Sequence, residues 1–421
     1  MVFADLFFLF AFLPAFALCY LLASLAEGNR VKNAVLVAFS LVFYAWGEPV
    51  YVFLLVFCAL LNWLVGLGIG RKGRGKTFLL IVGLACNLAI LGTFKYLGFF
   101  AEVLGRIGLT LSVPEIALPI GISFYTFQSI SYLVDVYRGE SPAQRRFGGL
   151  LLYIAMFPQL IAGPIVRYGT IAREIGQRKV TAGDLADGSF RFLVGLGKKV
   201  ILANQLSEVS DQFLAGNLAA LSTAGAWVGL LAFTLQIYFD FSGYSDMAIG
   251  IGRCLGFHFK ENFDHPYCCS SITDFWRRWH ISLGSFFRDY LYIPLGGNRR
   301  HQFLNILVVW FLTGMWHGAS WNFILWGLYF GLLVALEKYT VLRWRVPRWL
   351  RHVYSLLLVV LGWGLFYFVD FGQMTAFFPV LFGKAVAFTD FTVRSALLSR
   401  FWLWIAAVLC CLPLGRWAER L

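Results

Sequence analysis

The sequence predicts an all-α polytopic membrane protein, and two observations support this. Hydrophobic residues make up 59% of the 421 residues and charged residues only 14%, whereas an ordinary soluble domain carries about 25% charged residues. Apolar stretches that could cross about 30 Å of hydrocarbon, at about 1.5 Å per helical residue, recur along the whole chain. These features exclude a soluble domain and favour about ten to twelve transmembrane or re-entrant helices.

Nine segments are the clearest candidate spans because each is predominantly apolar. In chain order they are Leu6–Ala26, Tyr51–Ile69, Phe78–Phe100, Leu118–Val136, Ala226–Phe239, Phe303–Trp316, Trp321–Leu336, Val353–Phe368 and Phe401–Leu414. A further apolar run, Ala34–Trp46, meets Gly47-Glu48-Pro49, which we expect to form a tight turn. Gly148–Gly163 ends in Ala-Gly-Pro and Phe190–Leu206 contains two lysines, so we expect re-entrant or interfacial helices there.

The net charge of +13 comes from 35 Lys and Arg against 22 Asp and Glu. The basic residues gather in loops: Arg30 and Lys32, Arg71 to Lys76, Arg138 to Arg146, Arg167 to Lys179, Arg277 to Arg300, Arg343 to Arg351, and Arg416 with Arg420. The positive-inside rule places these loops in the cytoplasm, with the N-terminus outside and the C-terminus inside. Attraction to anionic membrane lipids explains the basic excess, and no nucleic-acid motif competes with that explanation.

The N-terminal segment bears on processing, and the cysteines bear on metal binding. The first apolar run follows Asp5 without a basic segment, so we expect an uncleaved first span rather than a signal peptide. The eight cysteines match no metal-ligand spacing. We therefore expect neither a bound metal nor a bound cofactor.

Two carboxylates, Asp240 and Asp246, interrupt an apolar run together with two serines and Gly243. Charged groups at membrane depth are costly, so each carboxylate is a functional hypothesis. Two interpretations stay open. The carboxylates belong to a satisfied polar network inside a helix bundle, or the helix breaks near Gly243 and exposes backbone groups to a cavity.

The segment from Ser271 to Trp326 holds the most informative polar residues. Thr273 can N-cap a helix that begins at Asp274. On a continuous helix from there, His280 shares the apolar face. A lone histidine on such a face is more often a core residue that donates to a backbone carbonyl than a functional group.

His317 follows an apolar run, Phe303–Trp316, of only fourteen residues. If that run starts at the cytoplasmic side, His317 lies at depth, about 20 Å along the helix at about 1.5 Å per residue. Gly314 and Gly318 flank it and allow the close approach of another backbone or of substrate. A desolvated imidazole there suits a general base; the alternative is an inert histidine hydrogen-bonded inside the bundle.

Four strings occur in a fixed order at residues 239–250, 274–283, 288–299 and 313–321. The last contains Trp-His-Gly at His317. Together they resemble the membrane-bound O-acyltransferase family, and within it the bacterial branch that includes alginate O-acetyltransferase. The resemblance covers about residues 1–330, so we expect one membrane-embedded acyltransferase domain over residues 1–421, with the family-like core followed by C-terminal spans over 331–421.

The resemblance implies a helical core that encloses a catalytic tunnel, with an activated acyl donor entering from the cytoplasm. It implies a catalytic histidine at His317 and a second polar position at His280. It also implies a separate extracytoplasmic partner, often an SGNH-hydrolase-like esterase, that passes the acyl group to a polysaccharide. We therefore predict an O-acyltransferase, and specifically an O-acetyltransferase, of the bacterial cytoplasmic (inner) membrane, with acetyl-coenzyme A or an acyl-carrier thioester as donor.

Acyl transfer to a hydroxyl needs a proton acceptor, a stabilised oxyanion and exclusion of water. We expect His317 to deprotonate the acceptor hydroxyl and His280 to orient a reacting group or help hold the oxyanion. Asp240, Asp246 and Asn322 are supporting candidates. Each of these roles is a hypothesis from residue type and position.

Three arginines, Arg277, Arg278 and Arg288, are candidates to bind the phosphates of the donor, although topology and lipid headgroups explain each of them equally well. Two other functions stay open. One is D-alanyl transfer from a carrier-protein thioester toward a teichoic-acid-type polymer. The other is a polytopic transporter, which the absence of a visible repeat and the histidine-centred polar cluster disfavour.

Overall fold

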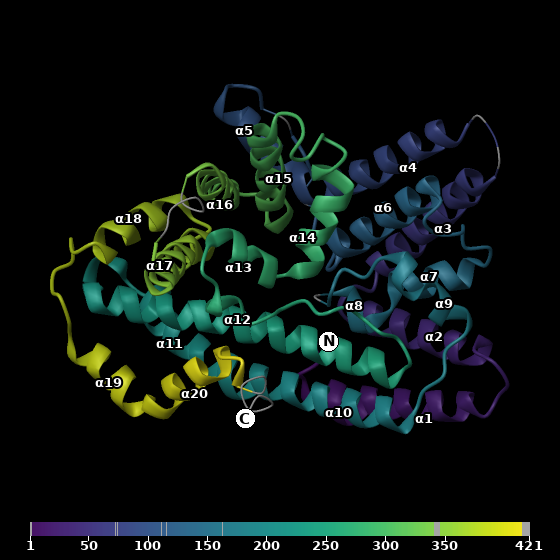
Figure 1. Ribbon diagram of the computed structural model, residues 1–421, viewed down its shortest axis with the longest axis horizontal. Helices are drawn as coiled ribbons and strands as arrows, with labels where there is room; N and C mark the ends of the chain where they lie inside the picture. The colour runs from purple at the N-terminus through teal and green to yellow at the C-terminus, as the bar shows by residue number, and fades with distance from the viewer. Residues whose placement is uncertain are drawn as a thin grey trace. The chain divides into compact units, whose positions relative to one another are not determined.

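The computed structural model describes residues 2–71, 73, 75–110, 112–114, 116–161, 163–340 and 346–414. Every regular element in these residues is a helix (Figure 1), which confirms the all-α prediction. Some of the predicted cytoplasmic basic residues lie outside the described residues: Lys72, Arg74, Arg343, Arg345, Arg416 and Arg420. The chain divides into two compact units, Met1–Leu196 with Tyr244–Lys260, and Gly197–Gly243 with Glu261–Leu421.

The first unit contains the helices from the N-terminus to residue 196. They are η1 (Phe8–Phe12), α1 (Leu13–Ser24), α2 (Arg30–Gly47), α3 (Tyr51–Gly70), α4 (Lys76–Leu91), η2 (Gly92–Tyr96), α5 (Leu97–Arg106), α6 (Ile122–Arg138), α7 (Phe147–Ala155), α8 (Phe157–Leu160), α9 (Tyr168–Gly176) and α10 (Ala182–Gly197). The predicted turn at Gly47-Glu48-Pro49 falls between α2 and α3. It is confirmed.

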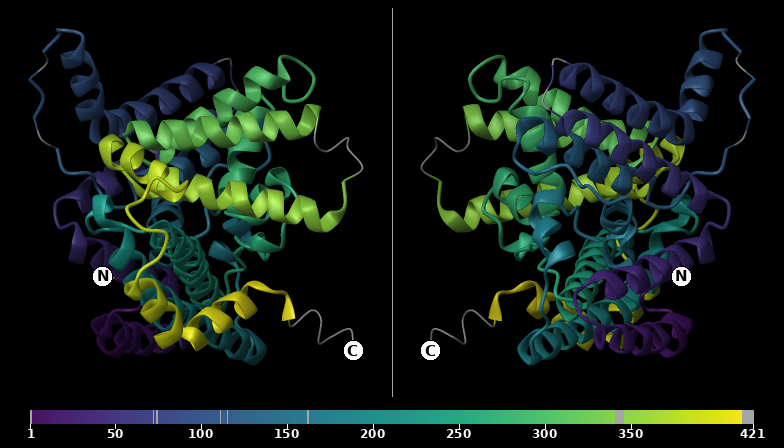
Figure 2. Two further views of the ribbon diagram at one scale, coloured as in Figure 1. Left: turned by 90° about the vertical axis from the view of Figure 1, so that its left-hand side faces the viewer. Right: turned by 90° about the vertical axis from the view of Figure 1, so that its right-hand side faces the viewer.

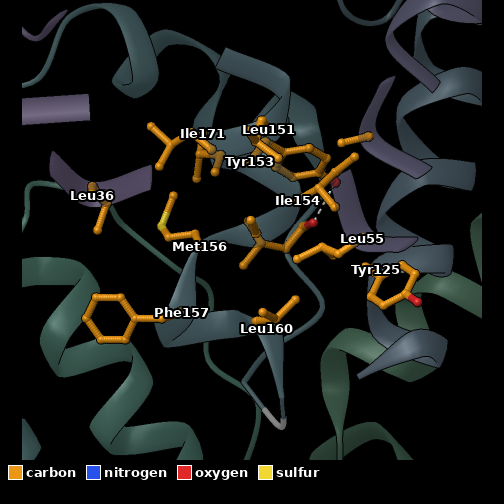
Figure 3. Packing of buried hydrophobic residues seen from close by; sticks show 14 of the residues in the cluster. Leu36, Leu55, Tyr125, Leu151, Tyr153, Ile154, Met156, Phe157, Leu160 and Ile171 are labelled. Carbon is orange, nitrogen blue, oxygen red and sulfur yellow. Dashed lines mark hydrogen bonds between the residues drawn. The ribbon is translucent and has the colours of Figure 1, made fainter. Parts of the chain in front are cut away.

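The core of the first unit is built around α7 and α8, whose side chains are almost all buried. Figure 3 shows Tyr153, Met156 and Phe157 among these packed residues. Some polar groups inside the unit pair with one another, because an unpaired polar group is costly in apolar surroundings. Asn62 of α3 and Asn87 of α4 exchange two amide hydrogen bonds of 3.0 and 2.8 Å.

The second unit contains most of the remaining helices. They are η3 (Lys198–Ala203), α11 (Asn204–Leu214), η4 (Leu218–Ala220), most of α12 (Thr223–Cys254), η5 (Pro266–Cys268), α13 (Ile272–Arg278), α14 (Ile281–Phe287), η6 (Arg288–Tyr292), α15 (Gln302–His317), α16 (Trp321–Tyr339), α17 (Arg348–Tyr367), α18 (Phe371–Leu381), α19 (Phe391–Ser399) and α20 (Phe401–Cys411). Figure 2 shows α16 and α17 side by side. Its core is rich in Trp and Phe.

The close packing of α15 on α16 depends on two glycines. A Cβ atom built on Gly327 would overlap the Trp310 carbonyl oxygen and would lie 3.1 Å from the Gly314 Cα. Only glycine permits two helix backbones to approach this closely. The contact lies one turn before His317, so it fixes where α15 presents that residue.

Among the described residues, four helical segments are long and apolar enough to cross a membrane: Tyr51–Gly70, Lys76–Arg106, Thr223–Cys254 and Arg348–Tyr367. A fifth is added if α19 and α20, bent by 64° at their junction, form one broken span. Phe8–Ser24 and Phe371–Leu381 are shorter apolar helices. The predicted total of about ten to twelve membrane elements stays a prediction.

The structure corrects the sequence interpretation around α13. The N-cap is Ser271, whose Oγ accepts from Asp274 N at 2.9 Å, and not Thr273, whose hydroxyl donates to Glu337. The expected continuous helix through His280 is also wrong. The chain breaks after Arg278, and His280 adopts a left-handed conformation with φ 46° before α14 begins.

Of the two interpretations left open for Asp240 and Asp246, the structure contradicts the helix break at Gly243. Helix α12 runs unbroken from Thr223 to Cys254. This outcome agrees with the paired polar network, because Asp240 lies against Lys199 and Asp246 against Arg191. The segment Phe190–Leu206 belongs to a continuous helical run formed by α10, η3 and α11.

Candidate active site

A cavity of about 440 Å³ lies in the second unit, lined by α13, α14, η6 and α15. Its lining includes Arg277, His280 and Arg288, three of the residues that the sequence singled out. The α15 side of the cavity includes Thr313. His317 lies one helical turn beyond Thr313 on the same face of α15.

His280 occupies the junction between α13 and α14, outside the candidate membrane-spanning helices, and is only 2% exposed. Its imidazole lies edge-on to the Phe241 ring, with 4.7 Å between centroids. Its Nδ1 is 3.2 Å from Asn262 Oδ1. Burial lowers the pKa of the His280 imidazole well below its usual value, and the neighbouring His317 lowers this pKa further. His280 is therefore neutral at physiological pH.

His317 is the last residue of α15 and is half-buried. Its ring lies edge-on to Trp326 of α16 and to Phe366 of α17, with centroid distances of 4.9 and 5.2 Å. These two aromatic rings pack against the imidazole. The sequence placed His317 at the end of a short helix, and the structure agrees.

Trp316 lies against both histidines. The centroid of its ring is 5.8 Å from that of His280 and 4.9 Å from that of His317. Two imidazoles that are 37 positions apart in the sequence thus share one aromatic neighbour. Of these two imidazoles, His280 lines the cavity.

Asn322 supports the wall next to His317. It is fully buried in the first turn of α16, and its amide donates to the carbonyls of Leu365 and Phe366 at 3.4 Å each. Its Oδ1 has no hydrogen-bond partner among the described residues. Asn322 therefore holds the end of α17, which carries the Phe366 ring against His317.

The two α12 carboxylates are ion-paired in different units. In the second unit, Asp240 lies 2.8 Å from Lys199 Nζ and accepts from Gln236 at 3.2 Å. In the first unit, Asp246 accepts from Arg191 at 2.8 and 3.1 Å. This geometry favours the satisfied polar network over a substrate-facing role.

The three candidate arginines differ in their surroundings. Arg278 is bound to Asp274 at 2.8 Å and does not line the cavity. Arg288 lines the cavity while its guanidinium pairs with Asp289 at 2.6 Å. Arg277 is exposed and also lines the cavity.

Two buried residues next to this site went unnoticed in the sequence. Glu337 is fully buried, and its carboxylate accepts from the backbone N–H groups of Ile272 and Thr273 at 2.6 and 2.8 Å, which fixes the start of α13. Asn262 is fully buried beside His280. The polar character of Asn262 next to Phe263 gave no local signal, because its partners lie about twenty residues downstream.

The described residues contain no group of three or more His, Cys, Asp or Glu side chains that could hold a metal ion. The cavity is lined by the His280 imidazole, by Arg277 and Arg288, and by mostly apolar side chains. Together with the long apolar helices, these features define a membrane-embedded enzyme suited to acyl transfer.

The chain belongs to the membrane-bound O-acyltransferase family, whose family model matches residues 147–369. It is 44% identical to the probable alginate O-acetylase AlgI of Pseudomonas aeruginosa, over 87% of this chain and 72% of the relative. It is 37% identical to the peptidoglycan O-acetyltransferase of Helicobacter pylori, over 79% of this chain and 69% of the relative. Identity to the teichoic acid D-alanyltransferase of Bacillus subtilis is 27%, over 60% of this chain and 67% of the relative.

These similarities confirm the predicted family, the multi-pass helical membrane fold and the enzyme class, an O-acetyltransferase. They decide against the transporter alternative, because the whole family is one of acyltransferases. The roles of individual residues stay predictions.

Proposed function

We propose that this enzyme moves an acetyl group from a cytoplasmic thioester to a hydroxyl on an extracytoplasmic polysaccharide, directly or through a partner protein. One observation carries the proposal: His280 and His317 flank Trp316, and His280 lines a cavity together with Arg277 and Arg288. The relatives named for alginate and peptidoglycan support a polysaccharide acceptor, because both polymers are built of sugars with free hydroxyls.

In the proposed reaction, His317 is the general base. The O–H bond of the acceptor breaks, its proton goes to the His317 imidazole, and the oxygen forms a bond to the thioester carbonyl carbon. The C–S bond then breaks, its electron pair stays on sulfur, and the imidazolium returns the proton to the thiolate. General-base catalysis of this kind contributes about 10²- to 10⁴-fold. The aromatic walls around His317 slow hydrolysis by excluding water.

His280 is the second polar group of the proposed site, and it orients a reacting group or helps to hold the oxyanion. Asn322 acts indirectly, by holding Phe366 against His317. Asp240 and Asp246 of α12 act as the charge partners of Lys199 and Arg191. Residues 1–421 form a single membrane-embedded acyltransferase domain in this proposal.

The donor enters from the cytoplasm, with Arg277 and Arg288 near its phosphates. Guanidinium groups bind phosphate through paired hydrogen bonds. Acetyl-coenzyme A and an acetylated carrier protein share the phosphopantetheine arm that would occupy the cavity. Arg278 is less suited to phosphate binding, because its guanidinium group already pairs with the Asp274 carboxylate.

We place the enzyme in the bacterial cytoplasmic membrane, with its N-terminus outside and its C-terminus in the cytoplasm. The basic loops support this orientation through the positive-inside rule. An SGNH-hydrolase-like partner outside the membrane would receive the acetyl group and pass it to the polymer.

The test uses inverted membrane vesicles supplied with radiolabelled acetyl-coenzyme A or with an acetylated carrier protein. We expect His317→Ala to abolish labelling of the acceptor and His280→Ala to reduce it strongly. His258→Ala is the matched control, because His258 is exposed in the first unit and pairs with Glu174. Labelling by His317→Ala at the parental rate would refute the general-base assignment.

A second candidate is D-alanyl transfer toward a teichoic-acid-type polymer, which the 27% identity to the Bacillus subtilis enzyme favours. The same vesicles supplied with a D-alanyl carrier protein distinguish the two. Faster transfer of D-alanine than of acetate would replace the acetyl proposal.

A further inference from the structure

Asn262 binds both sides of the left-handed turn at His280. Its main-chain carbonyl accepts from Ile281 N at 2.9 Å, and its side-chain Oδ1 accepts from Ser282 N at 3.1 Å. A left-handed conformation costs a residue with a Cβ about 1–2 kcal/mol. The two backbone bonds to Asn262 stabilise His280 in that conformation, although Asn262 lies 18 residues upstream.

The same contacts determine which nitrogen of His280 carries the proton. The Ser282 N–H can only donate, so the Asn262 side-chain atom that faces it is the oxygen. His280 Nδ1 lies 3.2 Å from that oxygen, and this contact favours a proton on Nδ1 over a lone pair that would face another acceptor. The Ser282 hydroxyl donates its one proton to the same Asn262 oxygen at 2.8 Å. The distance from the Ser282 hydroxyl to His280 Nδ1 is longer, at 3.4 Å.

A neutral His280 with the proton on Nδ1 has only a lone pair on Nε2. That nitrogen is buried without a hydrogen-bond partner among the described residues. A buried acceptor left unpaired costs about 1–3 kcal/mol, so a donor from a bound substrate would be stabilising there. A lone pair cannot donate a hydrogen bond to an oxyanion, which excludes one of the two roles that the proposed function left open.

The acceptor hydroxyl cannot supply this donor in the proposed reaction, because its single proton goes to His317. The phosphopantetheine arm has amide N–H groups, one of them two carbons from the thioester sulfur. His280 lines the same cavity as Arg277 and Arg288. An arm whose phosphates lie at these arginines would therefore bring an amide N–H to His280.

We propose that Asn262 is a positioning residue for acyl transfer: it holds His280 with the proton on Nδ1, so that Nε2 accepts a hydrogen bond from the amide N–H next to the thioester of the donor. This inference rests on the proposed function. It adds the specific contact by which the site recognises a pantetheine thioester and places its carbonyl near His317.

The first experiment compares acetyl-coenzyme A with an analogue in which that amide is replaced by an ester, which lacks the N–H. We expect kcat/KM of the parent enzyme to fall about 10-fold with the analogue. In Asn262→Ala this discrimination should disappear, because His280 is no longer fixed. Asn305→Ala is the matched control. Asn305 is also buried in the second unit, but it bonds to the loop carbonyls of Gly297 and Arg300.

The second experiment uses Asn262→Asp, whose carboxylate can accept the same hydrogen bonds and keep the fold. A carboxylate at this position stabilises imidazolium, which raises the pKa of His280. Imidazolium has no lone pair on Nε2, so we expect the acidic limb of the kcat/KM profile to move to higher pH by about one unit or more. A role of Asn262 in folding alone would leave that limb in place.

A direct readout of the proton position is ¹⁵N solid-state NMR of the full chain with labelled histidine, with His280→Asn used for assignment. We expect a protonated Nδ1 and an unprotonated Nε2. The reverse pattern would overturn the inference whether or not any variant folds. If His280→Ala keeps full activity, the role of His280 in the proposed function is wrong. If His280→Ala is impaired but the parent does not distinguish the two donors, only the present inference is wrong.

Discussion

Replacing Gly327 with alanine would push α15 and α16 apart beside His317. The new Cβ would overlap the Trp310 carbonyl oxygen and come within 3.1 Å of the Gly314 Cα, whereas ordinary contact begins at 3.4 Å. Backbone atoms cannot rotate away as a side chain can, so we expect the helices to separate by about 1 Å. Overpacking of this kind costs about 1–3 kcal/mol, of which up to about 1 kcal/mol is offset by the higher helix propensity of alanine.

The effect on activity should exceed the effect on stability. A shift of about 1 Å in a catalytic group can reduce the rate about 100-fold, and His317 lies three residues beyond Gly314. The assay is acetyl transfer in inverted vesicles, with thermal unfolding followed in detergent on the same preparations. Gly197→Ala is the control, because the nearest side-chain atom to its Cβ would be 4.0 Å away. If Gly327→Ala keeps the parental rate, the backbone contact does not set the position of His317.

Three further predictions concern the polar contacts around the site. Glu337→Ala leaves two buried N–H groups of α13 without an acceptor and should lower the free energy of unfolding by about 3–5 kcal/mol. Loss of less than 1 kcal/mol in a detergent unfolding series would contradict this. The ion pair formed by Lys199 and Asp240 is partly exposed. A double-mutant cycle to alanine should therefore give a coupling energy of only about 1 kcal/mol. A near-complete loss of acetyl transfer in Asp240→Ala would instead show a catalytic role for Asp240. Asn322→Ala should lower the free energy of unfolding by about 1–2 kcal/mol. It should also reduce kcat while the KM for the donor stays unchanged. A raised KM alone would instead indicate a role in binding the donor.

Around the histidines, local sequence patterns predicted the elements but not the contacts. The short apolar run before His317 correctly predicted a helix that ends at that residue. The helical face assigned to His280 was wrong, because the chain turns at that residue instead of continuing the helix. A left-handed conformation at a residue other than glycine leaves no mark on the helical periodicity of the sequence. It is stabilised by Asn262, which a periodicity argument cannot connect to it.

The charged residues of α12 show the same division. From the sequence, Asp240 and Asp246 were equally compatible with a pocket and with a paired network. The structure places Lys199 against one and Arg191 against the other. Both cations lie on the preceding helical run, about 40 to 55 positions upstream. Ion pairs over such separations arise from helix packing and leave no pattern in a single segment.

The sequence by itself determined the helical membrane class, the family and the position of His317, because apolar runs and ordered motifs are local properties of the chain. The tertiary structure alone decided the state of His280. Its left-handed conformation, its contact with Asn262 Oδ1 and the cavity that it lines come from Asn262, Trp316 and α15. The physical reason is that hydrogen bonds and ring contacts between distant segments exist only after the helices have packed.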